Sequence, residues 1–116
     1  MPAATHDILV EQGATYTQNL VWKDGSAVAI DLTGYTARMQ FRRTKSAATA
    51  LLSATTENGY ITLGDAAGTI DIEIPDDITA ALTVTRAVYD LELISSTGVV
   101  TRLIEGDVEI SKEVTR

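Results

Sequence analysis

Strict alternation of apolar and polar residues is the feature that most constrains how this chain folds. Every odd position in residues 35–41 is apolar and every even one is polar, and residues 70–74 and 89–93 alternate in the same way. Residues 16–22 follow the pattern with Gln18 among the apolar positions. Because successive side chains of a β-strand point to opposite faces, each segment predicts a strand with one buried face. The 17 Thr, 10 Ile and 9 Val residues also favour strands, so we expect an all-β fold.

Shorter segments complete the predicted architecture. Further strands are expected at residues 8–10, 50–54, 61–63, 99–104 and 108–110. Asn58-Gly59 fits a two-residue primed turn. After Pro75, apolar residues at helical spacing predict one short helical turn near residues 76–82, capped by Asp76 or Asp77. Short strands at this spacing indicate a sandwich or a barrel, and the late helical turn favours an immunoglobulin-like β-sandwich forming a single domain over residues 1–116.

The inward positions of these strands define a predicted core. Its members are Leu20, Trp22, Ile30, Leu32, Tyr35, Ala37, Met39, Phe41, Leu52, Ile61, Ile70, Ile72, Ile74, Leu82, Tyr89, Leu91, Leu93, Leu103, Val108 and Ile110. Gly106 interrupts the last strand-like stretch, which suggests a bulge or a bend there and a change of inward phase between Leu103 and Val108.

Composition excludes several kinds of site. The sequence has no cysteine and one histidine, His6, so thiolate chemistry and paired imidazole ligands are excluded. Its net charge of −7 argues against binding to nucleic acid or to an anionic membrane surface. No apolar run is long enough for a membrane helix, and no signal peptide is visible. We therefore expect synthesis in a cytoplasm, with no membrane and no nucleic acid as partner.

Catalysis is not predicted either. Three carboxylate pairs occupy outward strand positions: Asp71 with Glu73, Asp90 with Glu92, and Asp107 with Glu109. A glycosidase would need two carboxylates facing each other across a cleft, whereas alternation alone explains these pairs as a solvated sheet face. Asp65 lies in a turn without the spacing of a calcium loop. We expect no enzyme, no cofactor and no bound metal.

Two segments are candidates for binding a partner. Arg38, Gln40 and Arg42 share one outward strand face, which fits cross-strand pairing with an acidic strand or a docking patch for an acidic partner. Nucleic-acid binding is disfavoured because no aromatic side chains interleave with these cations. The apolar run from Ile8 to Val10 and the tail from residue 111 fit either pairing within the domain or addition to a neighbour's sheet.

The order of several segments resembles a phage family. Residues 30–42 read I-D-L-T-G-Y-T-A-R-M-Q-F-R, a short strand, a D-L-T-G turn and an Arg-rich alternating strand. They are preceded by L-V-W-K-D-G at residues 20–25, and followed by Y-D-L-E-L at 89–93 and V-T-R-L-I-E-G at 100–106. In this order, over about residues 10–111, the chain is similar to the N-terminal immunoglobulin-like domain of phage baseplate upper proteins and to small tail proteins.

That resemblance implies a virion structural protein of the tail or baseplate, without catalytic residues, that acts through contacts with other virion proteins. Baseplate upper proteins continue into a long receptor-binding region, whereas this sequence ends at Arg116, so a stand-alone docking or adaptor module is expected. A homo-oligomer is compatible with this role. The alternatives are a capsid decoration protein and, in another class, a carbohydrate-binding host-attachment module, which would need a row of exposed aromatic side chains.

Overall fold

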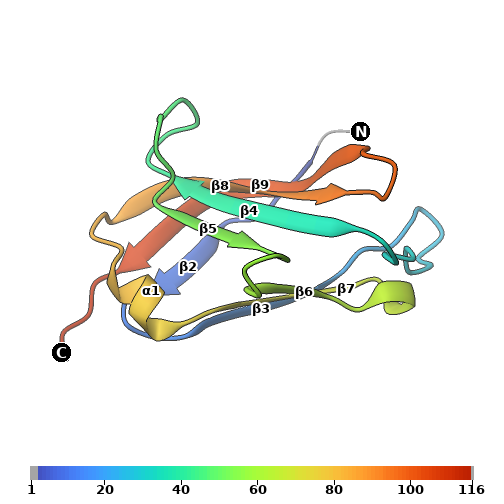
Figure 1. Cartoon of the computed structure of the whole chain (residues 1–116). Helices are drawn as coiled ribbons and strands as arrows, with labels where there is room; N and C mark the ends of the chain where they lie inside the picture. The colour runs from blue at the N-terminus through green and yellow to red at the C-terminus, as the bar shows by residue number, and fades with distance from the viewer. Residues whose placement is uncertain (1–2, 116) are drawn as a thin grey trace.

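The computed structural model describes residues 3–115, which form two packed β-sheets and two short helical segments (Figure 1). The strands are β1 (Ala4–Thr5), β2 (Ile8–Glu11), β3 (Tyr16–Val21), β4 (Thr36–Arg42), β5 (Leu52–Thr55), β6 (Ile61–Leu63), β7 (Thr69–Ile74), β8 (Arg86–Ile94) and β9 (Val100–Ser111). A 3-10 turn, η1 (Asp65–Ala67), precedes β7, and the helix α1 (Asp76–Ala80) follows it. The all-β prediction is confirmed.

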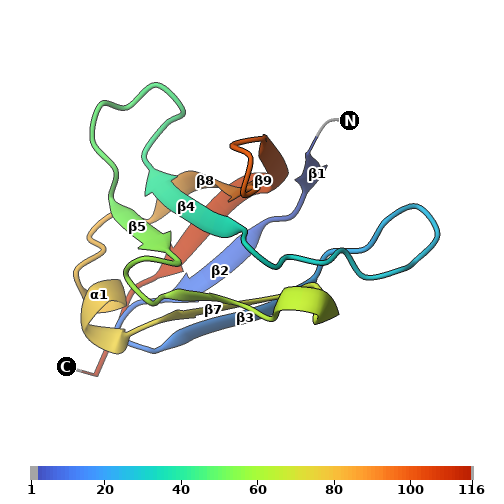
Figure 2. The same ribbon diagram turned by 45° about the vertical axis from the view of Figure 1, so that its right-hand side comes forward.

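The strand order is that of an immunoglobulin-like sandwich. The larger sheet has the order β1-β9-β8-β4-β5, with β2 also paired to β9, and the smaller sheet has the order β3-β7-β6. In immunoglobulin terms, β3, β7 and β6 correspond to strands B, E and D, whereas β4, β8 and β9 correspond to C, F and G. Figures 1 and 2 show the two sheets facing each other, with α1 at one end between them. The predicted fold class is therefore confirmed.

The core lies between the sheets, where the inward positions of the alternating strands meet. Most predicted core residues are buried, including Met39, Phe41 and Leu91. Five of them are only partly buried and pack against the core from its margins: Leu20, Trp22, Ile30, Tyr35 and Leu103. The structure adds buried side chains that the prediction left out: Ile8, Val10, Ala54, Thr79, Val84, Ala87 and Ile104.

The irregularity of β9 lies at Leu103, not at Gly106 as predicted. Leu91 pairs with Ile104 but Glu92 pairs with Arg102, so Leu103 is an extra residue in the ladder. From Ile104 onward the even positions point inward, which places Ile104 in phase with Val108. Gly106 pairs regularly with Tyr89, and its missing side chain serves a close approach of the N-terminal segment.

The turn at Asn58-Gly59 differs from the predicted primed turn of a hairpin. Asn58-Gly59 does not close a hairpin, because β5 and β6 belong to different sheets. Gly59 has a positive φ of 84° but Asn58 does not, so the turn is not of the primed type. Asn58 Oδ1 instead accepts hydrogen bonds from the amides of Thr55 and Tyr60, which holds the crossover.

The predicted helical turn is present as α1, but its cap differs from the prediction. Pro75 occupies the N-cap position, and Asp76 and Asp77 lie in the first turn without capping side-chain bonds. The fully buried Thr79 hydroxyl donates to the Ala14 carbonyl at 2.8 Å and accepts from the Gly13 amide at 3.1 Å. A buried hydroxyl needs such partners, and these two tie α1 to the connection between β2 and β3.

Candidate interaction surface on the larger sheet

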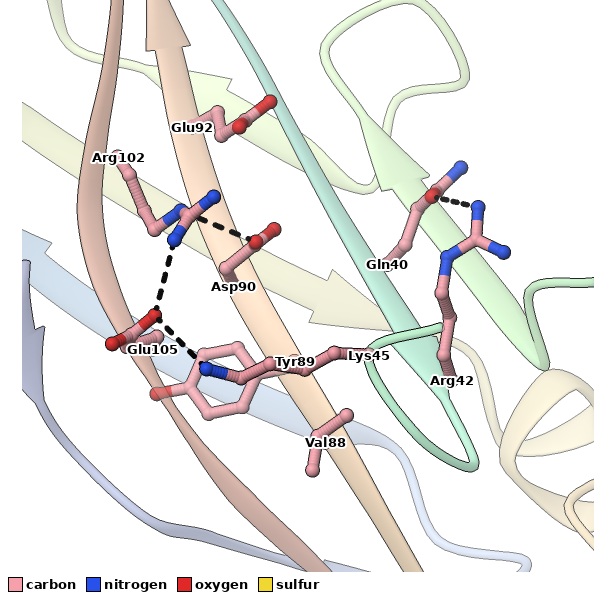
Figure 3. Close-up of a pocket in the computed structure, with 9 residues that line it drawn as sticks. All are labelled: Gln40, Arg42, Lys45, Val88, Tyr89, Asp90, Glu92, Arg102 and Glu105. Atoms are coloured by element: carbon pink, nitrogen blue, oxygen red, sulfur yellow. Dashed lines mark hydrogen bonds and ion pairs between the residues drawn. The ribbon is translucent and has the colours of Figure 1, made fainter. Parts of the chain in front are cut away.

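The outward side chains of three adjacent strands form the most strongly charged surface we identify. We call it the outer charged face, and it consists of Arg38, Gln40, Arg42, Lys45, Val88, Asp90, Glu92, Arg102 and Glu105. All of them except Arg38 line a shallow hollow of about 280 Å³ formed by β4, β8, β9 and the loop after β4 (Figure 3). Arg38 lies beside this hollow, next to Gln40, Asp90 and Glu92. Because the strands are hydrogen-bonded neighbours, the sheet fixes the spacing of these side chains.

Cross-strand pairing of the basic residues, one of the two predicted roles, is present for Arg38. It pairs with Glu92 of β8, and Arg38 Nε lies 2.7 Å from Glu92 Oε1. Arg42 differs, because its guanidinium donates to the Gln40 side-chain carbonyl and to the Ala47 backbone carbonyl, each at 2.8 Å. Both arginines therefore lie on the predicted face, held by neighbours of the same chain.

A second charged cluster on this face was not predicted. Arg102 lies 3.4 Å from Asp90 Oδ2 and 3.4 Å from Glu105 Oε1, and Lys45 approaches the same Glu105 oxygen at 3.9 Å (Figure 3). In a regular strand Arg102 and Glu105 would point to opposite faces, since one has an even and the other an odd position. The bulge at Leu103 turns both outward. The adjacent apolar pair Leu103-Ile104 is the sequence signal that could have revealed this change of phase.

The electrostatic environment of Asp90 depends on its burial and on its charged neighbours. Partial burial, followed by the negative charge of Glu92, raises the pKa of Asp90 above its ordinary value. The positive charge of Arg102 lowers this pKa but does not outweigh these effects, even at 3.4 Å.

The cations of the outer charged face remain accessible, since the side chains of Arg38, Arg102 and Lys45 are 54%, 51% and 81% exposed. Exposed ion pairs stabilise a fold by only about 0–1 kcal/mol each, so these charges are better suited to recognition than to stability.

The strand containing Ile8 and Val10 pairs within the domain. Ile8 pairs with Val108 and Val10 with Ile110, in parallel with β9. Both side chains are buried in the domain's own core, so the structure shows pairing within the domain, which is one of the two predicted alternatives. Ser111 is likewise the last residue of β9. Leu9 is the exposed apolar side chain of this strand.

Each residue of the D-L-T-G segment, residues 31–34, has a structural role. Asp31 Oδ1 accepts hydrogen bonds from the amide and the hydroxyl of Thr33, and these bonds lower the pKa of Asp31. Leu32 is buried, and its carbonyl accepts from the Tyr35 amide. Gly34 adopts a positive φ of 82°, which favours glycine. The segment is a turn that introduces β4.

Aromatic side chains do not form a platform on the surface. All six aromatic residues lie within residues 3–115, and each is buried or half-buried. Trp22 packs edge-to-face against Tyr35 with ring centroids 6.1 Å apart, and Phe41 packs similarly against Tyr89 at 6.2 Å. Tyr60, the one ring outside the predicted inward positions, is half-buried against the core.

Residues 3–115 also bear on metal binding and on membrane spanning. They contain no group of three or more His, Asp or Glu side chains arranged to hold a metal ion. In the same part of the chain, no helix is both long and apolar enough to span a membrane.

The one histidine, His6, has a structural contact. Its backbone carbonyl accepts a hydrogen bond from the Tyr89 hydroxyl, which joins β8 to the N-terminal segment.

Comparison with known proteins gives no assignment: no protein-family model matches the sequence, and no curated protein matches it either.

Proposed function

We propose that this chain is a structural protein of a phage tail or baseplate, which docks onto other virion proteins through its outer charged face. The observation that carries the proposal is the charge distribution. Four cationic side chains and three carboxylates lie on this face, whereas the whole chain carries a net charge of −7. The face is therefore the region where an acidic surface can approach this acidic protein with the least repulsion.

The form of the face also supports docking. All of its charges except that of Lys45, which lies in the loop after β4, project from β4, β8 and β9, and these adjacent strands hold them at fixed spacing. Arg38 and Arg102 are paired yet half-exposed, so a partner can share them without an unpaired charge being created. The sequence resemblance over about residues 10–111 supplies the phage context.

The two alternative functions are a capsid decoration protein and a carbohydrate-binding module. A capsid decoration protein uses the same kind of sandwich and would dock by the same chemistry, so only its place in the virion distinguishes it. A carbohydrate-binding module stacks sugar rings on exposed aromatic side chains. Because every aromatic ring here is buried or half-buried, this alternative has no platform to support it.

The test is the position of the protein in the virion of the phage that encodes it. Purified virions would be separated into tails and capsids, and each fraction analysed by mass spectrometry. The proposal expects the chain in tails, in a fixed ratio to the other tail proteins. Its presence in capsids alone would establish the decoration role instead, and its absence from intact virions would overturn both.

A further inference from the structure

β3 forms one edge of the smaller sheet and lacks the features that protect the other sheet edges from pairing with another chain. Sheet edges are potential pairing sites, and proteins protect them with short strands, charges, proline or bulges. β1, β5 and β6 are short, with two, four and three residues, and β2 ends in a charged Glu11. β3 has six residues, Tyr-Thr-Gln-Asn-Leu-Val, with no charge, proline or glycine. It is the one unprotected edge among the described strands.

The pairing register shows which backbone groups of β3 point outward. Trp22, the residue after β3, donates its amide to Gly68 at 2.9 Å, which makes them a hydrogen-bonded pair. Such pairs alternate along an antiparallel ladder, so the even residues of β3 bond to β7 and the odd ones do not. In agreement, the amide of Glu73, which is opposite Thr17, donates to Tyr60 and not to β3.

The backbone N–H and C=O groups of Thr17, Asn19 and Val21 therefore point away from β7. Within residues 3–115, no backbone partner is found for them across this edge. Figures 1 and 2 show β3 at the rim of the smaller sheet, beyond β7. In constant-type immunoglobulin sandwiches, strand A pairs with strand B at this position, whereas here both N-terminal strands pair with β9 instead.

The inner side of the same edge is incompletely covered. Tyr16 and Leu20 point toward the core from β3, but each is only half-buried. Burial of part of the Tyr16 ring raises the pKa of its hydroxyl to about 12, and that hydroxyl donates to Gln18 at 2.7 Å. A strand added beside β3 would cover these side chains, and its own inward side chains would then need to be apolar.

The outer side of the edge is acidic. Asp71 and Glu73 project from the outer face of β7, and Asn19 donates to one Asp71 oxygen at 2.7 Å. The remaining outward positions of β3, β6 and β7 are neutral. An added strand would thus meet only negative charge on this side, so outward Lys or Arg side chains complement it.

From these observations we infer that β3 accepts an extended segment of a partner protein, with alternating apolar and basic side chains, by β-strand addition. Main-chain hydrogen bonds to Thr17, Asn19 and Val21 would hold the segment, and its alternating side chains would give specificity. The inference rests on the proposed docking role but uses the opposite sheet, which allows one domain to connect two virion proteins.

A peptide of alternating valine and lysine, matched to β3 in length, provides the probe. It would be titrated into isotopically labelled protein while amide resonances and hydrogen exchange are followed by NMR. We expect shifts and slowed exchange at the amides of Thr17, Asn19 and Val21, without change in β5. A valine–glutamate peptide of equal length is the charge control and should bind more weakly. Undisturbed β3 amides, or equal binding of both peptides, would overturn the inference.

One substitution removes an outward donor without breaking the ladder to β7. Thr17→Pro deletes the outward N–H, which an edge strand tolerates, and should weaken peptide binding about tenfold. Thr17→Val keeps the N–H and should bind as the unaltered protein does. If Thr17→Pro does not fold, a valine–lysine peptide with N-methylated backbone donors tests the same bonds from the other side. Undiminished binding in either experiment contradicts strand addition.

Two outcomes separate this inference from its alternatives. Dimerisation of the protein alone, abolished by Thr17→Pro, would assign the edge to a second copy of the chain and overturn the choice of a basic partner. The outer charged face takes no part in the peptide experiment. Failure of strand addition thus leaves the proposed tail or baseplate role to be decided by virion fractionation. Failure of that role likewise leaves strand addition to be decided by the peptide experiment.

Discussion

Gly106 lies directly against the backbone of His6: a Cβ atom at residue 106 would be 2.4 Å from the His6 carbonyl oxygen. The same carbonyl accepts a hydrogen bond from the Tyr89 hydroxyl, and Asp7 Oδ1 accepts one from the Asp107 amide at 2.9 Å. These contacts lie between β1 and β2, both of which pair with β9. Gly106 is thus what lets the N-terminal segment lie close along the last strand.

Gly106→Ala should loosen this attachment. Because the nearest obstacle is the His6 backbone carbonyl, the clash cannot be relieved by rotating a side chain, and we expect a loss of about 1–3 kcal/mol in the free energy of unfolding. Urea denaturation measures the loss, and hydrogen exchange should be faster at β1 and β2. Gly25→Ala is the control, since no atom lies within 4 Å of its Cβ position. Equal stability of the two variants would contradict the assigned role of Gly106.

The strand phase of β4 predicts opposite effects for two adjacent residues. Met39 is 1% exposed between the sheets, whereas Gln40 points outward. Met39→Asp places an unpaired carboxylate in the core, at a cost of several kcal/mol, which approaches the whole stability of a domain. Gln40→Asp keeps the charge in water and should fold. Circular dichroism in urea separates the two, and a cooperative transition in Met39→Asp would mean that the phase is wrong.

The fold was predictable because alternation carries the needed information. In β4, β7 and β8, period-two patterns decide which face is buried, and two sheets with one buried face each must pack together. The N-terminal pairing was not predictable in the same way, since Ile8-Leu9-Val10 fits an internal strand and a donated one equally well. Contacts between residues far apart in sequence decide it, among them the pairing of Ile8 with Val108 and the close approach of Gly106 to His6.

The candidate surface was only half predictable for a related reason. Arg38, Gln40 and Arg42 share a face of one regular strand, so their grouping follows from the sequence. Arg102 and Glu105 meet only because Leu103 is an extra residue relative to β8. A bulge depends on the partner strand, and a single strand's pattern shows at most a break in phase.

Charge reversal on the outer charged face tests docking. Arg38→Glu with Arg42→Glu should reduce incorporation into virions, because an acidic partner would meet carboxylates where it met guanidinium groups. Folding should persist, although the carboxylate introduced by Arg38→Glu would face Glu92 of β8, and like charges cost up to about 1 kcal/mol. Mass spectrometry of virions measures incorporation. Normal incorporation of the double variant would remove this face from the proposed function.

Two controls separate docking from stability. Lys23→Glu matches Arg42→Glu in charge but lies in the loop after β3, and should incorporate normally. Adding Glu92→Arg to the double variant restores an ion pair across β4 and β8 while exchanging its two charges. Recovery of incorporation in this charge-swapped variant would show that the defect came from stability, and a persisting defect supports recognition of the arginine positions.

The pKa of Asp90 gives a prediction for pH dependence. Partial burial and Glu92 raise this pKa in the folded protein above its ordinary value of 3.8. The Asp90 carboxyl therefore holds its proton more tightly in the folded state than in the unfolded state. The free energy of unfolding consequently falls as the pH rises from 3.8 through the raised pKa of the folded protein. Below pH 3.8 the carboxyl is protonated in both states and has no such effect.

Asp90→Asn should therefore be as stable as the unaltered protein at acidic pH and more stable near pH 7, because the amide carries no charge to desolvate. Urea denaturation of both proteins across this pH range measures the difference. The control is Asp71→Asn on the opposite sheet, which removes the same charge from the chain and so corrects for the change in net charge. If Asp90→Asn is instead less stable at neutral pH, the ion pair with Arg102 outweighs burial, and the stabilising role belongs to that pair.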